Sequence, residues 1–143
     1  MARISNPHES DPGSVQLPTN GKTLLLAEDD PFISRMYQTK LTSAGFTVLM
    51  VNNGRDAYEQ IKAHKPDLAM LDINMPELSG FEVVRALLAD NVGLAVSHII
   101  VLTNSANPAD RKLATELGVE YMIKADMTPR EVLDHINNKL GLG

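Results

Sequence analysis

Polar residues suited to chemistry stand at the ends of short apolar segments in this chain. Five of them do so: Glu28, Asp29, Asp72, Thr103 and Lys124. Three carboxylates held close together repel one another, and a hard cation such as Mg²⁺ relieves that repulsion. A lysine and a threonine hydroxyl nearby suit an anion such as a phosphoryl group, and aspartate is a known covalent acceptor of phosphoryl groups. The residue types therefore predict magnesium-assisted phosphoryl chemistry, provided that the fold brings them together.

The apolar segments themselves are typical of buried strands. They lack polar alternation and lie at 23–27, 47–51, 68–71, 99–103 and 121–123. Such runs suit strands that are buried on both faces, as in a parallel sheet.

Apolar residues at helical spacing fill the intervals between these segments. In the first interval Phe32, Met36, Tyr37 and Leu41 are predicted to share one face of a helix, with Met36 as a core filler. Helix starts are indicated by N-caps followed by proline, at Asp30-Pro31, Asn107-Pro108 and Thr128-Pro129, the last with Glu131 as a capping box. Helix ends are predicted at Gly45 and Gly118.

Five strand–helix units predict a doubly wound α/β domain. The count fits a flavodoxin-like (βα)5 fold with a parallel five-stranded sheet of order 2-1-3-4-5. Ligands of such open sheets bind beyond the carboxyl ends of the strands, at the switch point in strand order. Because the first and third strands are neighbours in that order, Glu28, Asp29 and Asp72 are expected to converge. The chain ends about where the fifth helix ends, which predicts that no DNA-binding output domain follows.

Composition restricts the class of partner. The net charge is −5 and there is no cluster of Lys and Arg, which argues against nucleic acid or an anionic membrane. The absence of cysteine excludes disulfides and Cys-ligated zinc. No apolar run reaches the ~18 residues of a membrane helix, and no signal peptide core is present, so a cytoplasmic location is expected. Residues 1–21, with three prolines, predict a flexible tail before a domain at 22–143.

Four motifs together resemble the response regulator receiver family of two-component signalling systems. "LLLAEDDP" (24–31) resembles the acidic motif after the first strand, and "LDINMPELSG" (71–80) resembles the phosphoacceptor loop. "VLTNSA" (101–106) resembles the strand with the switch threonine, and "YMIKA" (121–125) the strand with the switch aromatic residue and the lysine. The resemblance covers roughly residues 22–141, with the motifs in the family's order and spacing.

The resemblance implies a phosphoacceptor and a metal site. Asp72 would accept the phosphoryl group, and Glu28 and Asp29 would hold Mg²⁺, one of them through water. Asn74 would offer its backbone carbonyl to the same metal. The protein would thus be a phosphoacceptor switch that catalyses its own phosphorylation and dephosphorylation, not a turnover enzyme.

The resemblance also implies a switch and its partners. Thr103 and Lys124 would bind the phosphoryl oxygens, and Tyr121 would turn inward on activation. The phosphoryl group would come from a sensor histidine kinase or a histidine phosphotransfer protein. A downstream effector protein would bind the face formed by the fourth helix, fifth strand and fifth helix. The chain would be a monomer or a phosphorylation-dependent dimer.

Two residues depart from the family pattern. Ala125 follows Lys124 where the family usually has proline, often after a cis bond, so the loop after the fifth strand is expected to differ in shape. Asn104 stands after the switch threonine where Ala or Gly is common. It either narrows access to the phosphoryl site or hydrogen-bonds the phosphoryl group.

Two other functions remain open from the sequence. One is an unphosphorylated scaffold that binds a partner constitutively, which the intact acidic set argues against and which should show no Mg²⁺ binding. The other is a phosphatase with an aspartyl nucleophile. Such enzymes typically carry a second aspartate two residues after the first, where this chain has Asn74.

Overall fold

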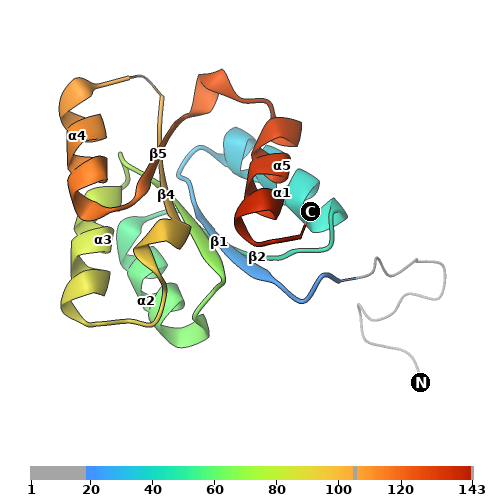
Figure 1. Cartoon of the computed structure of the whole chain (residues 1–143), viewed down its shortest axis with the longest axis horizontal. Helices are drawn as coiled ribbons and strands as arrows, with labels where there is room; N and C mark the ends of the chain where they lie inside the picture. The colour runs from blue at the N-terminus through green and yellow to red at the C-terminus, as the bar shows by residue number, and fades with distance from the viewer. Residues whose placement is uncertain (1–18, 105, 143) are drawn as a thin grey trace.

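Five parallel strands form one sheet in the order β2-β1-β3-β4-β5, as predicted (Figure 1). The computed structural model describes residues 19–104 and 106–142, apart from the side chain of Val96. The strands are β1 (Thr23–Ala27), β2 (Thr47–Val51), β3 (Leu68–Asp72), β4 (Ile99–Thr103) and β5 (Glu120–Ile123). The helices are α1 (Pro31–Ser43), α2 (Gly54–His64), α3 (Gly80–Ala89), α4 (Pro108–Leu117) and α5 (Pro129–Lys139), with short 3₁₀ helices η1 (Val96–His98) and η2 (Lys124–Asp126).

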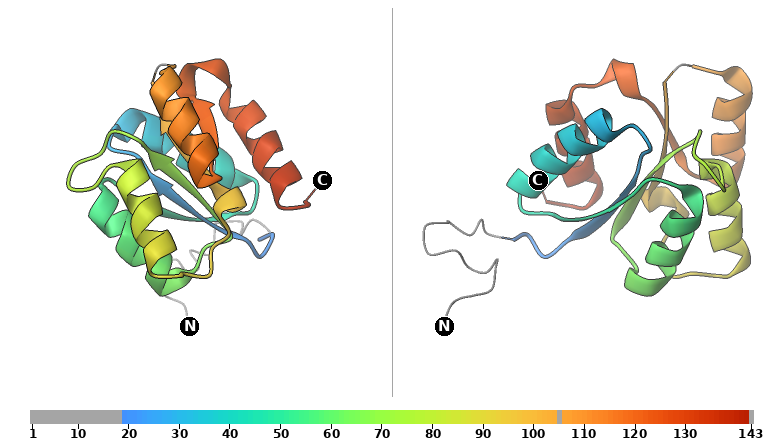
Figure 2. Two further views of the ribbon diagram at one scale, coloured as in Figure 1. Left: turned by 60° about the vertical axis from the view of Figure 1, so that its left-hand side comes forward. Right: turned by 180° about the vertical axis from the view of Figure 1, so that it is seen from behind.

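Burial on both faces explains why the strands carry uninterrupted apolar runs. Successive side chains of a strand point to opposite faces, and helices cover each face of this sheet (Figures 1 and 2). Leu24 and Leu26 pack in the core with α1 and α5, whereas Leu25 and Ala27 pack in the core with α2, α3 and α4. Every residue of β3 and β4 is buried.

The helix starts confirm the predicted caps. The Asp30 side chain accepts hydrogen bonds from two amides of α1, and the Asn107 side chain does the same for α4. Thr128 and Glu131 form the predicted capping box. A second capping box, between Ser79 and Glu82 at the start of α3, was not predicted. These caps fix where each helix leaves the carboxyl edge of the sheet.

The predicted apolar face of α1 is only half right. Tyr37 and Leu41 are buried, but Phe32 is 88% exposed and Met36 is 44% exposed, so Met36 is not a core filler. Ile33 lies one turn before Tyr37 and packs against the same core. Because each residue advances about 100° around a helix, the stripe through Ile33, Tyr37 and Leu41 turns Phe32 and Met36 toward solvent.

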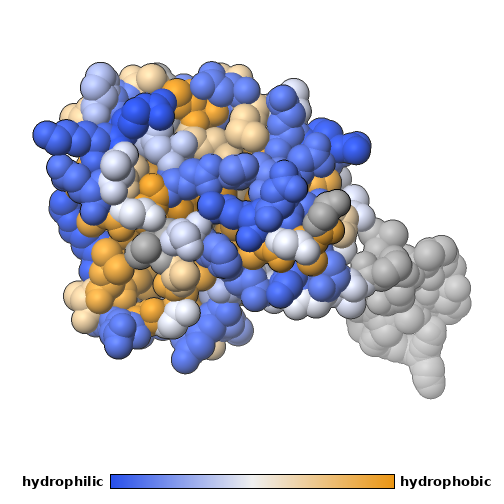
Figure 3. All heavy atoms as spheres, in the orientation of Figure 1, coloured by the Kyte–Doolittle hydropathy of each residue, from blue (hydrophilic) through white to orange (hydrophobic). Residues whose placement is uncertain are grey.

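The described residues contain no helix that is both long and apolar enough to cross a membrane. In the view of Figure 3 the surface is mainly hydrophilic, and apolar residues gather at its lower left. Most of the predicted N-terminal tail, residues 1–18, lies outside the described residues. Its last part contacts the domain, since the Asn20 amide donates to the Gly45 carbonyl at 3.0 Å.

Candidate functional site

Asp72 is the last residue of β3 and is only 4% exposed. The apolar run 68–71 holds it in the centre of the sheet, between β1 and β4. One of its carboxylate oxygens, Oδ1, accepts a hydrogen bond from the Asn74 amide at 3.2 Å. The backbone of Gly80 packs closely against Asp72, because a Cβ on Gly80 would lie 2.7 Å from the Asp72 carbonyl oxygen. Asp72 is therefore a nearly buried carboxylate with a fixed position.

Glu28 and Asp29 follow β1, the neighbour of β3 in the sheet. Glu28 is 2% exposed, and its Oε2 accepts a hydrogen bond from the Asp30 amide at 3.1 Å. Asp29 is exposed. One carboxylate oxygen from each of Glu28, Asp29 and Asp72 lies within 4.8 Å of the others. The predicted convergence of three carboxylates is thus present.

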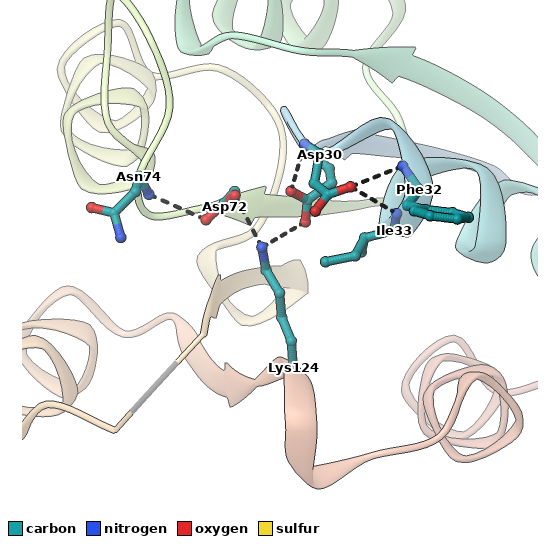
Figure 4. Close-up of polar contacts among 7 residues, drawn as sticks. Asp30, Phe32, Ile33, Asp72, Asn74 and Lys124 are labelled. Atoms are coloured by element: carbon teal, nitrogen blue, oxygen red, sulfur yellow. Dashed lines mark hydrogen bonds and ion pairs between the residues drawn. The ribbon is translucent and has the colours of Figure 1, made fainter.

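Lys124 supplies the positive charge of this cluster. It follows β5 directly, and its Nζ lies 2.7 Å from Glu28 Oε1 and 3.0 Å from Asp72 Oδ2 (Figure 4). The three side chains are between 0% and 7% exposed. Lys124 is therefore a shared counter-ion for two buried carboxylates, a contact that the sequence had not indicated.

Burial and pairing shift two pKa values in this cluster. Burial raises the pKa of Glu28, and the charge of Asp72 adds to the rise, while Lys124 and the Asp30 amide oppose it. Burial alone lowers the pKa of Lys124, but hydrogen bonds and charge from Glu28 and Asp72 outweigh it, so the net pKa of Lys124 is raised. Lys124 is consequently charged at neutral pH and stabilises the charged form of Glu28.

A cavity of about 470 Å³ opens above these residues. Its lining includes the acidic residues, Lys124, Asn74 and Asn104. Ile33 forms part of its wall, whereas the ring of Phe32 points away from Asp72 (Figure 4). On the other side of Glu28 and Asp29, a second cavity of about 500 Å³ reaches Asn52 and Asp56. Asp72 thus lines a cavity that is open to solvent.

The donor set fits a hard divalent cation. Carboxylate oxygens are the ligands that Mg²⁺ prefers, together with several waters. Exposed Asp29 lies at the open side of the cluster, where those waters have room, and Asn74 lines the same cavity. Because Lys124 already pairs with Glu28 and Asp72, a metal ion at this site competes with its ammonium group.

The remaining predicted residues lie next to the cluster. Thr103 is the last residue of β4, 4% exposed, beside Asp72 on the neighbouring strand. Tyr121 belongs to β5 and lines a separate cavity of about 220 Å³. Its hydroxyl accepts a hydrogen bond from the Asn107 amide at 3.1 Å, and the Arg111 guanidinium lies 4.7 Å from the centre of its ring. Neither of these two contacts was predicted from the sequence.

The loop after β3 is held by a close contact that sequence reasoning also missed. The Gly54 amide donates to the Pro76 carbonyl at 3.1 Å, and a Cβ at Gly54 would overlap the Leu78 carbonyl oxygen. Glu77, which lies between Pro76 and Leu78, has a positive φ of 72°. The sequence offered one signal of this contact, which is Gly54 at the first position of α2, directly after the N-cap Asn53. Ala125 lies in η2, and no cis peptide bond is present in the described residues.

Known proteins match this chain in sequence. The response regulator receiver domain family matches residues 24–137. Transcriptional regulatory protein GltR of Pseudomonas aeruginosa is 36% identical over 117 residues, which are 82% of this chain and 48% of that protein. The chain therefore spans about half the length of this relative. Polar-differentiation response regulator DivK of Brucella anthropi is 27% identical over 120 residues, 84% of this chain and 97% of DivK.

Solved structures agree with these sequence matches. The BeF₃-activated N-terminal receiver domain of Klebsiella pneumoniae RstA superimposes with a TM-score of 0.72 at 26% identity. The superposition covers 82% of this chain and 97% of that domain.

Proposed function

Because this chain belongs to the response regulator receiver family of two-component signalling systems, we propose that Asp72 accepts a phosphoryl group from a histidine kinase or a histidine phosphotransfer protein. The observation that carries the proposal is the Asp72 carboxylate at the base of an open cavity, between two further carboxylates and the Lys124 ammonium. Transfer from such a donor would take place in the cytoplasm, and residues 22–143 would form the receiver domain.

The chain's own residues have distinct roles in this transfer. A carboxylate oxygen of Asp72 forms a bond to phosphorus as the bond from phosphorus to the donor's imidazole nitrogen breaks. The nitrogen leaves with its electron pair. Glu28, Asp29, Asp72 and the Asn74 carbonyl would hold Mg²⁺, which would supply positive charge that stabilises the phosphoryl oxygens. In dephosphorylation a water oxygen bonds to phosphorus as the bond from phosphorus to the Asp72 oxygen breaks. This step regenerates the Asp72 carboxylate and releases inorganic phosphate.

Lys124 changes partners during this cycle. In the resting protein its Nζ contacts Glu28 Oε1 and Asp72 Oδ2. Phosphorylation adds a charge of about −1.5 to −2 beside it, so we expect the ammonium group to bind a phosphoryl oxygen. The hydroxyl of Thr103, at the end of the next strand, binds another phosphoryl oxygen. Tyr121 then moves inward behind Thr103.

The output of this switch is a protein-binding surface. Thr103 precedes α4, and Tyr121 lies in β5, so both residues connect the phosphoryl site to the face formed by α4, β5 and α5. A local change in charge is thereby converted into a change of surface shape. The partner on this face is a downstream effector protein or a second receiver domain.

Labelling with a small phosphodonor tests the proposal directly. Purified protein is incubated with phosphoramidate and Mg²⁺, and the gain of one phosphoryl group is followed by mass spectrometry. We expect labelling of the wild type, none of Asp72→Asn, and none of the wild type in EDTA. Asp134→Asn is a matched control, because this exposed carboxylate on α5 pairs with Arg130 away from the cavity. It should label like the wild type.

Two results contradict the proposal. Labelling that persists in Asp72→Asn assigns the phosphoryl group to another residue. A wild type that is not labelled and does not bind Mg²⁺ favours the constitutive scaffold instead.

A further inference from the structure

Tyr121 is held by two groups of the same helix. Its hydroxyl accepts the hydrogen bond from the Asn107 amide, and the guanidinium of Arg111 lies over its ring. Asn107 is the N-cap of α4, and the Arg111 amide donates to the Asn107 carbonyl at 3.0 Å, in the first turn of that helix. Both contacts therefore join β5 to the first turn of α4, which lies beside it (Figure 1).

The same turn of α4 is connected to the phosphoacceptor site. Asn107 comes four positions after Thr103, and Asn104, between them, lines the cavity above Asp72. The Asn107 side chain accepts hydrogen bonds from the Ala109 and Asp110 amides, so its own amide moves with α4. On the proposed function, Thr103 moves toward a phosphoryl group, and the amide that Tyr121 contacts follows it by only four positions in the chain.

We propose that Arg111 and the Asn107 amide form a clasp that holds Tyr121 in its resting position and raises the threshold for switching. This inference rests on the proposed function, because it assumes that loading of Asp72 moves Thr103 and Tyr121. The clasp stabilises the resting arrangement only, since an inward movement of the ring takes it away from the Arg111 guanidinium. A contact made in one of two states shifts their equilibrium by its full strength.

The expected size of this shift follows from the contact. Arg111 is exposed and Tyr121 is half-buried, and a cation–π contact at such a site corresponds to about a two- to fivefold change in an equilibrium constant. Loss of Arg111 should therefore make the phosphoryl-like state easier to reach by this factor. Lysine at the same position keeps the charge but loses the planar group that stacks on the ring, so its effect should lie between wild type and alanine.

The chain contains a matched control for this contact. The Lys62 ammonium lies over the ring of Tyr58 at 4.7 Å, the same distance as for Arg111 and Tyr121. Lys62 is likewise exposed and Tyr58 half-buried, but both belong to α2, away from β5. Lys62→Ala thus removes one positive charge and one cation–π contact, together with a hydrogen bond to the Tyr58 hydroxyl and an exposed ion pair with Asp90, without touching the proposed clasp.

The test combines a beryllofluoride titration with NMR of the tyrosine rings. Beryllofluoride with Mg²⁺ stands in for the phosphoryl group on Asp72. The chain has three tyrosines, so ring ¹³C labelling gives three sets of signals, which Tyr37→Phe and Tyr58→Phe assign. We expect Arg111→Ala to shift the Tyr121 signals and to bind beryllofluoride about two- to fivefold more tightly. Lys62→Ala should leave the titration unchanged.

Each other outcome has a definite meaning. If Arg111→Ala binds beryllofluoride equally or more weakly, or if Lys62→Ala changes the titration as much, the clasp is refuted while the proposed function stands. Unshifted Tyr121 signals in Arg111→Ala refute the contact itself. A wild type that does not respond to beryllofluoride refutes the proposed function and the clasp with it.

Discussion

Lys124 offers the most direct test of how the acidic cluster is stabilised. Replacing it with methionine keeps a long flexible side chain of similar volume and removes the charge. The ammonium group then no longer separates Glu28 Oε1 and Asp72 Oδ2, which lie 2.7 and 3.0 Å from it in the resting protein. Both carboxylates stay nearly buried, and neither gains another cation from the chain at these distances. The domain should therefore lose stability when no metal is present.

The distances give the size of this loss. At an effective dielectric constant of about 20, Coulomb's law gives about 6 kcal/mol for the pair with Glu28 and about 5.5 kcal/mol for the pair with Asp72. Repulsion between the two carboxylates is present with and without Lys124, so it does not enter the difference between the two proteins. The removal of the ammonium group from water offsets several kcal/mol of this attraction, and breaking a buried ion pair by removing one partner typically costs about 3–5 kcal/mol. We therefore expect Lys124→Met to lower the free energy of unfolding by about 3–5 kcal/mol in EDTA.

Mg²⁺ should restore part of that loss, because it takes over the role of counter-ion. Without the competing ammonium group the variant should bind Mg²⁺ more tightly than the wild type. At saturating metal, a tenfold gain in affinity narrows the difference in unfolding free energy between wild type and variant by about 1.4 kcal/mol. Urea unfolding with EDTA and with excess Mg²⁺ measures both quantities. Lys139→Met is the control, because Lys139 pairs with Glu120 outside the cluster and is 22% exposed. Equal losses for the two variants, or a loss that Mg²⁺ leaves unchanged, would refute the reasoning.

The pH dependence has a defined sign. The pKa of Glu28 is raised in the folded protein above its ordinary value of 4.5, so between the two values the folded state binds more protons than the unfolded state. The contribution of Glu28 to stability consequently falls as pH rises through this window. Loss of Lys124 raises the pKa of Glu28 further. The deficit of Lys124→Met in EDTA should therefore be smaller near pH 5 than at pH 7.

Three further predictions concern the scaffold around the site. Gly54→Ala should lower the free energy of unfolding by about 3 kcal/mol, because the added methyl group overlaps the β3–α3 loop. Gly93→Ala meets no atom within 4 Å and should lower it by less than about 1 kcal/mol. Urea denaturation of the two variants measures both losses. Phe32→Ala should change stability by no more than about 0.5 kcal/mol and Leu41→Ala by about 2–5 kcal/mol, since one is exposed and the other buried, and thermal unfolding checks this. The pKa of Glu120 is lowered because hydrogen bonds to His135 and Lys139 outweigh burial. Glu120→Gln should therefore lower the free energy of unfolding by about 1 kcal/mol at pH 7. In a denaturation series this difference from the wild type should disappear as the pH falls below 4.5 and through the lowered pKa.

Features that depend on local sequence were predictable. Uninterrupted apolar runs gave the strands, with β3 extending one residue further to Asp72 and β5 starting one residue earlier, at Glu120. Caps with proline gave the starts of α1, α4 and α5. The strand order then placed Glu28 and Asp72 together, because parallel strands meet at one edge of the sheet. The convergence of the acidic residues therefore followed from topology, without any knowledge of side-chain conformation.

Contacts between side chains from distant segments were not predictable in the same way. The sequence indicated that Lys124 stands at the edge with the carboxylates, but not that its Nζ reaches Glu28. The prediction of which face of α1 is buried was wrong for a related reason. Phe32 with Met36 and Ile33 with Tyr37 are two apolar pairs at helical spacing, and only packing against the sheet decides which of the two stripes turns inward. Arg111 carried no signal at all, because an exposed arginine on a helix is ordinary until a ring lies beneath it.

The contacts of Lys124, which directly follows β5, and those of Tyr121, which lies in β5, differ in strength, and that difference separates their roles. The ion pairs of Lys124 with buried carboxylates correspond to about 3–5 kcal/mol, whereas the contact of Arg111 with Tyr121 corresponds to about 0.5–1 kcal/mol. A phosphoryl group on Asp72 would offer Lys124 a new anionic partner and so replace the stronger contact, but it would offer Arg111 no new partner. On the proposed function, the acidic cluster would decide whether the loaded site is stable, while the proposed clasp on Tyr121 would set how completely loading moves the α4–β5–α5 face.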